Sequence, residues 1–180
     1  MKQHIIPAIR LTIATLLLFA VVYPVTLWGI AQLSPNSGKG EVIEHNGKTY
    51  YSNIGQSFTD DKYFWSRPSA VDYNAAGSAG SNKGPSNEEY LAQVQARIDT
   101  FLVHNPEVNK SEIPVDLITA SGSGLDPDFS DQAAKVQVKR IAKIRKIEEA
   151  KLLELIDSQT EKPLLGLFGP EKINVLRLNI

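Results

Sequence analysis

The sequence predicts an α+β domain, or a small α/β sandwich, that is anchored by one N-terminal transmembrane helix. The first observation is a run without charged residues from Leu11 to Leu33. The second is that residues 34–180 have the length of a single domain. The third is the expected order of elements in that domain, which mixes short strands and amphipathic helices around one long loop.

The apolar run from Leu11 to Leu33 has the length of a membrane-spanning helix. At 1.5 Å per residue it spans about 35 Å, whereas a bilayer core is about 30 Å thick. Pro24 is expected to kink this helix. A cleaved signal peptide is the alternative, because Lys2 and Arg10 precede the run. The run is longer than the apolar region of a signal peptide, so we expect an uncleaved anchor.

The charges on either side of the apolar run bear on its orientation. Lys2 and Arg10 precede it, and Lys39 and Lys48 follow it. A count of Lys and Arg alone therefore hardly distinguishes the two orientations of the helix in the membrane. The segment before the helix is short and basic, which favours a cytoplasmic N-terminus. This interpretation predicts a cytoplasmic tail at 1–10, a transmembrane helix at 11–33, a linker at 34–40 and a single globular extracytoplasmic domain at 41–180.

The first half of the domain is expected to hold a hairpin, a loop and a helix. Residues 41–43 and 49–52 read as strands around Asn46-Gly47, a strong hairpin signal. Residues 53–87 form a loop rich in Gly, Ser, Asn and Pro, and a loop of this length usually makes contacts or carries function. Ser86 and Glu89 have capping-box spacing, which predicts a helix that ends near His104-Asn105-Pro106. Its expected apolar face consists of Leu91, Val94, Ile98, Phe101 and Leu102.

The second half is expected to alternate strands and helices. Val115–Ala120 reads as a buried strand, and Ser130 as the N-cap of a helix that runs to about Lys146. A break near Ile147 is expected before a second helix at 148–159. Ile173–Ile180 reads as a terminal strand.

The helix expected after Ser130 has a clear inner face. Ala134, Val138 and Ile141 are expected to point inward, and the lysines at 135, 139, 143 and 146 outward. The basic run Lys139–Lys146 is therefore interpreted as a solvated face, with contact to an acidic partner or a lipid headgroup as the alternative.

Composition argues against several classes of function. The chain has no cysteine, and its formal net charge of −1 argues against binding to nucleic acid. His4, His45 and His104 have no partner at metal-ligand spacing, so no metal site is expected. No nucleophile–base pair is visible, so no catalytic residue is predicted.

Two motifs leave alternatives open. The turn Ser121–Gly124 has the glycine content of a phosphate cradle but lacks the Lys of a P-loop, and Asp126 and Asp128 would repel phosphate. A structural turn is favoured there, with a nucleotide contact as the alternative. The aromatic block Tyr63-Phe64-Trp65 before Arg67 reads either as core and loop anchors or as a partner interface.

Several ordered blocks resemble a known family. They are Phe64-Trp65-Ser66-Arg67-Pro68-Ser69-Ala70, Asp72-Tyr73-Asn74, Gly80-Ser81-Asn82, Gly84-Pro85-Ser86-Asn87, residues 114–127 and Asn174-Val175-Leu176 with Leu178-Asn179. Together with the N-terminal helix they resemble the C subunits of potassium-transporting ATPases, the KdpC family, over most of residues 7–180. The resemblance implies a non-catalytic accessory subunit of a high-affinity, ATP-driven potassium pump in the bacterial inner membrane.

The resemblance also implies partners and ligands. The partners are a channel-like potassium-binding subunit, a P-type ATP-hydrolysing subunit, a small membrane subunit and membrane lipid, and potassium is the transported ion. The family is described as raising the ATP affinity of the catalytic subunit, so ATP is the implied cofactor. Its implied contacts are Ser121, Gly122, Ser123, Gly124 and Gln137. The implied partner contacts are Tyr63, Phe64, Trp65, Arg67, Tyr73, Asn74 and Asn82.

An ATP contact conflicts with the expected topology, because ATP is cytoplasmic and the domain is expected outside. The topology is preferred, since a long polar domain cannot cross lipid. An outside domain would cap the potassium entrance of the channel-like subunit. Two departures from the family pattern, Asp128 and the charge-dense stretch Lys143–Lys151, also weaken a nucleotide role. The alternative function is a membrane-tethered ligand- or nucleotide-binding domain that acts outside a pump.

Overall fold

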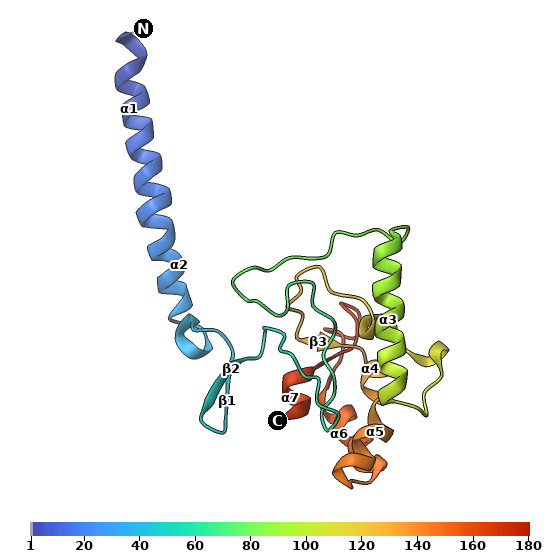
Figure 1. Ribbon diagram of the computed structural model, residues 1–180. Coiled ribbons are helices and arrows are strands. Elements are labelled where there is room, and N and C mark those ends of the chain that lie inside the picture. Colours follow the sequence, from blue (N-terminus) through green and yellow to red (C-terminus); the bar gives the residue numbers. More distant parts are fainter. Residues whose placement is uncertain (1) are drawn as a thin grey trace. The chain divides into compact units, whose positions relative to one another are not determined.

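The computed structural model describes residues 2–180 and has the expected mixture of helices and strands (Figure 1). The chain divides into two compact units between Glu44 and His45. The N-terminal unit is dominated by one long helix, and the C-terminal unit carries helices α3 (Glu88–His104) to α7 (Val175–Asn179) and a small three-stranded sheet. The prediction of a mixed α+β protein with one long apolar N-terminal helix is confirmed.

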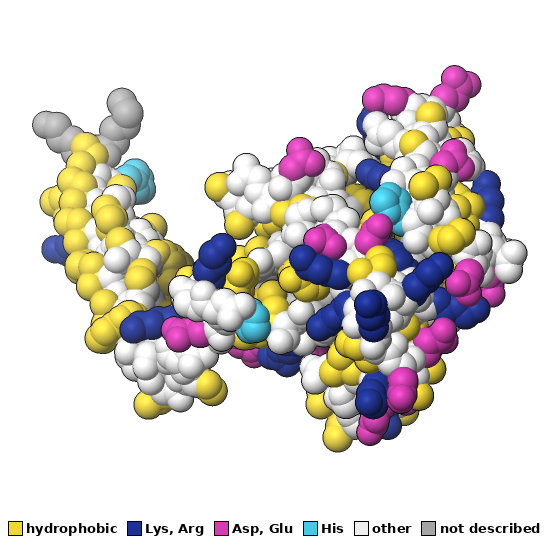
Figure 2. Space-filling model, turned by 60° about the horizontal axis from the view of Figure 1, so that its bottom comes forward, with side chains coloured by type: hydrophobic (Ala, Val, Ile, Leu, Met, Phe, Trp, Pro, Cys, Tyr) yellow, Lys and Arg dark blue, Asp and Glu magenta, His cyan; other side chains and the backbone are white. Residues whose placement is uncertain are grey.

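The N-terminal helix is long and apolar enough to cross a membrane. Three consecutive segments form it: α1 (Lys2–Leu17), η1 (Leu18–Val22) and α2 (Tyr23–Ala31). Its apolar stretch Gln3–Ala31 has 29 residues, none of them buried within the protein, and Figure 2 shows its surface covered with hydrophobic side chains. The helix begins at Lys2 rather than Leu11, so the residues predicted as a separate tail are helical from Lys2 onward.

The distortion expected at Pro24 takes the form of a wider helical turn. Proline has no N–H, and its ring meets the carbonyl four residues earlier. Immediately before it, η1 is a π-helical turn, a widening that relieves this kind of clash. The hydroxyl of Thr26 donates to the carbonyl of Val22 over 2.8 Å, so this polar side chain is satisfied within the helix.

The predicted hairpin is confirmed at the boundary of the two units. Strands β1 (Val42–His45) and β2 (Lys48–Tyr51) pair as a two-stranded sheet. Asn46 and Gly47 connect them with φ angles of 51° and 74°. Positive φ at both positions is what makes Asn-Gly the preferred pair in such turns. The preceding turn, η2 (Pro35–Gly38), is capped by the hydroxyl of Ser34.

The C-terminal unit has a three-stranded antiparallel sheet in the order β3-β5-β4. Phe129 of β3 and Thr160 of β4 both face Ile173 of the central strand. The elements of this unit after the hairpin and the long loop are α3 (Glu88–His104), η3 (Lys110–Glu112), η4 (Val115–Leu117), β3 (Asp128–Phe129), α4 (Asp131–Lys135), α5 (Val138–Arg145), α6 (Glu149–Gln159), β4 (Thr160–Glu161), β5 (Lys172–Asn174) and α7 (Val175–Asn179).

The core forms where α4, α6 and α7 contact the central strand β5. Ile173 of that strand is fully buried, as are Ile141 of α5 and Ile156 of α6. Ala134 and Val138 are also buried, which confirms the predicted inner face. The lysines at 135, 139, 143 and 146 are exposed as predicted.

The helix α3 ends at His104 as predicted, but its cap and its apolar face differ. Asn87, not Ser86, is the N-cap, and its side-chain oxygen accepts a hydrogen bond from the backbone N–H of Tyr90 over 2.8 Å. Asn is as good a cap as Ser, so spacing alone could not choose between neighbours. Leu91 is 50% exposed, so the buried face starts further along the helix, at the partly buried Val94.

Two predicted strands are wrong. Residues 115–120 contain the short 3-10 helix η4 instead, where the backbone N–H of Thr119 bonds the carbonyl of Val115 over 2.9 Å. Ile173–Ile180 is a strand only to Asn174 and then becomes α7, because the Asn174 side chain caps the N–H of Arg177. Short apolar runs do not separate strand from helix by pattern alone.

The helix predicted from Ser130 to Lys146 is two helices. Ser130 caps α4 as predicted, and its hydroxyl accepts from the N–H of Ala133 over 3.1 Å. The chain then turns between α4 and α5. The predicted break near Ile147 is confirmed, because Lys146 adopts a left-handed φ of 55° and α6 starts at Glu149.

Candidate functional site

The centre of the candidate site is the side chain of Arg140, which α5 places inside the C-terminal unit. Only 7% of this residue is exposed. Its guanidinium donates hydrogen bonds to four uncharged oxygens: the Asp61 carbonyl (3.1 Å), the Tyr63 carbonyl (2.8 Å), the Asn105 side chain (3.3 Å) and the Gln137 side chain (2.8 Å). One side chain thereby joins the long loop to the end of α3 and the start of α5.

The indole ring of Trp65 covers the guanidinium of Arg140, at 4.7 Å from its centroid. A cation over an aromatic face is favourable, and more so when it is desolvated. The other contacts of the indole are with Phe101 and His104, whose ring centroids lie 6.2 and 4.8 Å away. The backbone N–H of Trp65 donates to Gln137 over 2.8 Å. Trp65 is thus held in place through both its ring and its backbone.

Burial lowers the pKa of Arg140 to about 10, and the nearby carboxylate of Asp61 partly opposes this effect. The pKa still lies well above neutral pH, so the guanidinium keeps its charge. A charge in this environment is stable only when its donors are satisfied. The four oxygens and the indole provide that environment.

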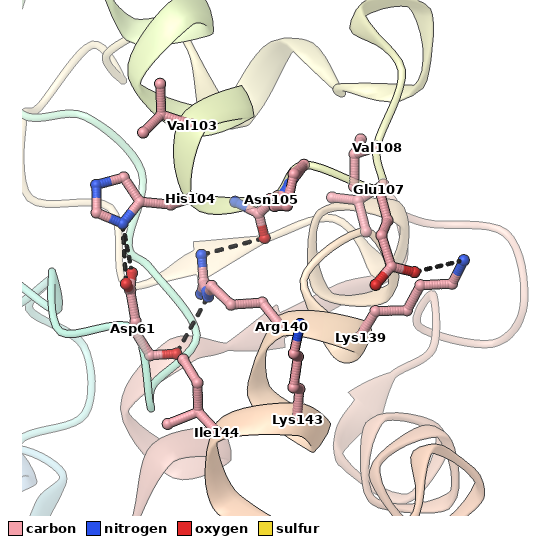
Figure 3. A pocket seen from close by; sticks show the side chains of 12 residues that line it. Asp61, Val103, His104, Asn105, Glu107, Val108, Lys139, Arg140, Lys143 and Ile144 are labelled. Atoms are coloured by element: carbon pink, nitrogen blue, oxygen red, sulfur yellow. Dashed lines mark hydrogen bonds and ion pairs between the residues drawn. The ribbon is translucent and has the colours of Figure 1, made fainter.

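A cavity of about 280 Å³ opens beside this cluster (Figure 3). On one side His104 Nδ1 lies 2.8 Å from a carboxylate oxygen of Asp61, and on another Lys139 pairs with Glu107 at 3.4 Å. Its lining is Asp61, Val103, His104, Asn105, Pro106, Glu107, Val108, Val136, Lys139, Arg140, Lys143 and Ile144. Lys139, Arg140 and Lys143 line the cavity together with the carboxylates of Asp61 and Glu107.

Two asparagines near the C-terminus hold the long loop and the residue before it, Ser52, against the core. Asn179 acts like a neighbouring strand: its side chain accepts from the N–H of Phe64 over 2.8 Å and donates to the carbonyl of Phe64 over 2.9 Å. Asn174 donates to the carbonyl of Ser52 over 2.7 Å. A loop without regular structure must find partners for its buried backbone groups, and these side chains supply them.

The turn Ser121–Gly124 packs against the same long loop. The hydroxyl of Ser69 donates to the carbonyl of Gly124 over 2.7 Å, and the N–H of Gly124 donates to the hydroxyl of Ser121 over 3.0 Å. Gly124 has a φ of +67°, and a Cβ there would lie 2.7 Å from the side chain of Val71, whereas a Cβ at Gly122 would meet nothing within 4 Å. The strand β3 separates the turn from α4, so the turn does not open a helix.

Comparison with known proteins places the whole chain in one family. Residues 5–180 match the family described as "KdpC: K+-transporting ATPase, c chain". The chain belongs to this family. It is similar to the "Potassium-transporting ATPase KdpC subunit" of Flavobacterium johnsoniae, with 58% identity over 179 residues that cover 99% of this chain and 96% of that relative.

More distant relatives agree. The KdpC subunit of Phocaeicola vulgatus is 52% identical over 181 residues, 98% of this chain and 96% of the relative. That of Caldanaerobacter subterraneus subsp. tengcongensis is 44% identical over 182 residues, 100% and 94% of the two chains. The resemblance read from the sequence is confirmed, and the chain is a non-catalytic subunit of the Kdp potassium-transporting ATPase complex. Membership implies the other Kdp subunits as its partners.

The KdpC motif residues predicted as partner contacts differ in how far they are exposed to solvent. Phe64 is 1% exposed and belongs to the core. The residues Tyr63, Trp65, Arg67 and Tyr73 are half-buried, and Asn74 and Asn82 are exposed. Partner contact stays a prediction for all seven of these residues. For Phe64, the structure shows a core role.

Two of the half-buried motif residues hold the loop together. Arg67 pairs with Asp126 at 2.5 Å, and the Tyr73 hydroxyl donates to the carbonyl of Arg67. Burial raises the pKa of Tyr73, since its phenolate would lose hydration. These contacts connect the motif to the segment that follows the turn Ser121–Gly124.

The structure gives the residues predicted for ATP contact other uses. Gln137 is fully buried; its side-chain oxygen accepts from Trp65 and Arg140, and its amide donates to the carbonyl of Ala133 over 2.9 Å. The turn Ser121–Gly124 holds the long loop. An ATP contact therefore stays an expectation of the family resemblance.

The sequence interpretation does not single out Arg140, and it names Asn105, Asn174 and Asn179 without assigning a role to their side chains. Arg140 belongs to the basic run Lys139–Lys146, for which the sequence predicts a solvated face; for this residue the prediction is wrong. Gln137 and Arg140 are three residues apart, so they share a helix face with Ile141. That spacing was the available signal for a buried polar stripe.

Proposed function

We propose that this Kdp subunit is a membrane-anchored structural subunit that stabilises the pump and supports its channel-like and ATP-hydrolysing subunits from the extracytoplasmic side of the membrane. The observation that carries the proposal is the exposed apolar helix Gln3–Ala31 in a chain whose full length matches a pump subunit. A helix of 29 residues is about 43 Å long, enough for a bilayer with its headgroup regions. It would hold the C-terminal unit permanently beside its partners.

In this proposal the N-terminus is cytoplasmic, the helix spans the bacterial inner membrane and the domain lies outside. The short basic segment with Lys2 and Arg10 supports this orientation. An outside domain is placed to cap the potassium entrance of the channel-like subunit. The engaged polar atoms of Gln137 and the internal hydrogen bonds of the turn Ser121–Gly124 favour partner support over direct ATP binding.

The orientation predicts labelling of the domain from outside. The chain has no cysteine, so Lys48→Cys and Lys143→Cys each introduce one reactive thiol. We expect both variants to react with a membrane-impermeant maleimide in intact cells, because both side chains are exposed. Gln3→Cys is the matched control and should react only after the membrane is opened. Protection of Lys143→Cys in intact cells would place the domain inside and favour an ATP contact.

The stabilising role predicts loss of the pump when the chain is deleted. Cells that rely on this pump should stop growing at micromolar potassium, and the channel-like and ATP-hydrolysing subunits should no longer purify together in mild detergent. The full chain should restore both properties. Residues 1–44, the N-terminal unit alone, should not. Normal growth and intact assembly in the deletion strain would favour the alternative, a tethered ligand-binding domain outside a pump.

A further inference from the structure

The loop between β4 and β5 exposes a run of large apolar side chains. We call residues 164–168 the apolar tip. Leu164 is 70% exposed, Leu165 and Leu167 are each 80% exposed, and Phe168 is 63% exposed. Such fractions mean that these side chains project from the domain and contact little of it. A contiguous patch of this kind on a soluble domain usually marks a contact surface.

The backbone of the apolar tip is already satisfied by its own turn. Leu164 and Phe168 exchange both of their backbone hydrogen bonds at 3.0 Å. The N–H of Gly166 donates to the carbonyl of Pro163 over 2.9 Å, and that of Leu167 to the carbonyl of Leu164 over 3.2 Å. Covering the tip with an apolar surface would therefore leave few backbone polar groups without a hydrogen-bond partner. The turn is also held in shape before any partner arrives, which favours binding.

Leu165 adopts a backbone conformation that is unfavourable for leucine. Its φ is +56° and that of Gly166 is +72°, nearly the angles of Asn46 and Gly47 in the hairpin β1–β2. The hairpin has the Asn-Gly pair preferred for this geometry, whereas the apolar tip has a leucine in the left-handed region. Because the leucine is also 80% exposed, it gains no burial within the domain in return. This combination indicates a contact outside the chain.

The area and charge of the apolar tip point to one kind of occupant. Three leucines and one phenylalanine, each well over half exposed, present on the order of 500 Å². That is less than the roughly 800 Å² per partner of a standard free-standing interface, which argues against a second copy. Glu161 and Glu171 offset Lys162 and Lys172 beside the tip, so no basic rim is present for anionic lipid.

We propose that the apolar tip docks into an uncharged apolar recess on another subunit of the Kdp complex. The inference rests on the proposed function, because the small contact is sufficient only in a chain that its helix already holds beside the partner. Tethering of this kind makes a second contact effectively intramolecular. The tip then fixes how the domain sits on its partner.

Photo-crosslinking in cells that express the whole complex tests this contact. Leu167 is replaced by p-benzoylphenylalanine, and Val115, which is 69% exposed and lies in η4, receives the same replacement as the control. We expect an adduct with the mass of this chain plus one other Kdp subunit at position 167 and none at position 115. Adducts with lipid only, adducts between two copies of this chain, or no adduct above the control would each overturn the proposal.

A second measurement separates docking from folding. Leu165→Asn should leave the melting temperature of the full chain in detergent unchanged or higher, since Asn suits the left-handed φ. The same variant should lower recovery of the other subunits about tenfold, as expected when one buried leucine contact is lost. Val115→Asn should change neither recovery nor growth. If Leu165→Asn leaves assembly intact while deletion of the chain abolishes it, the docking proposal is wrong and the proposed function stands.

Discussion

Arg140→Ala is expected to lower the free energy of unfolding by about 3–5 kcal/mol, because it leaves buried hydrogen-bond acceptors without a donor. The Tyr63 carbonyl loses its bond of 2.8 Å to Arg140, and the side-chain oxygen of Asn105 loses one of 3.3 Å. The indole of Trp65 loses the cation over its face. Removing a desolvated charge offsets part of this loss, so the total stays below the sum of the separate contacts.

Chemical denaturation of the full chain in mild detergent, followed by the fluorescence of Trp65 with Trp28 replaced by Phe in every variant, measures this effect. Arg140→Lys should lie between the parent and Arg140→Ala, since an ammonium keeps the charge but cannot reach four oxygens arranged around a guanidinium. Lys139→Ala is the matched control: the neighbouring residue is exposed and its ion pair with Glu107 is 3.4 Å long. It should change stability by less than about 0.5 kcal/mol. Equal stability of Arg140→Ala and Lys139→Ala would contradict the assigned role.

Local signals in the sequence were sufficient where one short-range interaction decides the structure. Asn46-Gly47 predicted the hairpin because few residue pairs adopt positive φ twice in succession. The absence of charge from Leu11 to Leu33 predicted the long helix, although its start at Lys2 was missed. Ser130 and the break near Ile147 were also found, since caps and helix ends depend on neighbouring residues.

Contacts between distant residues account for most of what the sequence did not reveal. Asp116 accepts the backbone N–H of Ser130 over 2.6 Å, a contact within the region where a strand was expected. Asn179 meets Phe64 across 115 positions of the chain, so no local pattern announces it. Arg140 lies among exposed lysines, and only the fold shows that the long loop covers it. In the sequence, a buried arginine among exposed lysines cannot be told apart from another solvent-facing cation.

These distant contacts give the aromatic block of the family motif a role in the fold of the domain. A block of aromatic residues and an arginine has the composition of an interface centre, and this suggested a surface for partners. In the structure the backbone N–H groups of Phe64 and Trp65 donate to Asn179 and Gln137. The motif therefore helps to shape the domain, and contact of its residues with a partner stays a prediction. The exposed Asn74 and the apolar tip are better placed for contact than the buried members of the motif.

Phe64→Ala is expected to lower the free energy of unfolding by about 3–5 kcal/mol, the usual range for removing a buried phenylalanine. The side chain is 1% exposed and belongs to the main core, so its removal leaves a cavity. The loop cannot easily collapse into that cavity, because Asn179 fixes the backbone of Phe64 on both its N–H and its carbonyl. Denaturation of the full chain in detergent, with near-ultraviolet circular dichroism as the signal, measures the change.

Phe168→Ala is the matched control, because it removes the same side chain from a site that is 63% exposed. Its effect on the free energy of unfolding should stay within about 0.5 kcal/mol. If the apolar tip docks on a partner, however, Phe168→Ala should reduce recovery of the other Kdp subunits while the chain itself remains folded. Phe64→Ala should reduce recovery only in proportion to the fraction of chain that is unfolded. The same substitution at two positions thus distinguishes a residue that stabilises the fold of the domain from one that contacts a partner subunit. Equal effects of the two substitutions on the free energy of unfolding would contradict both assignments.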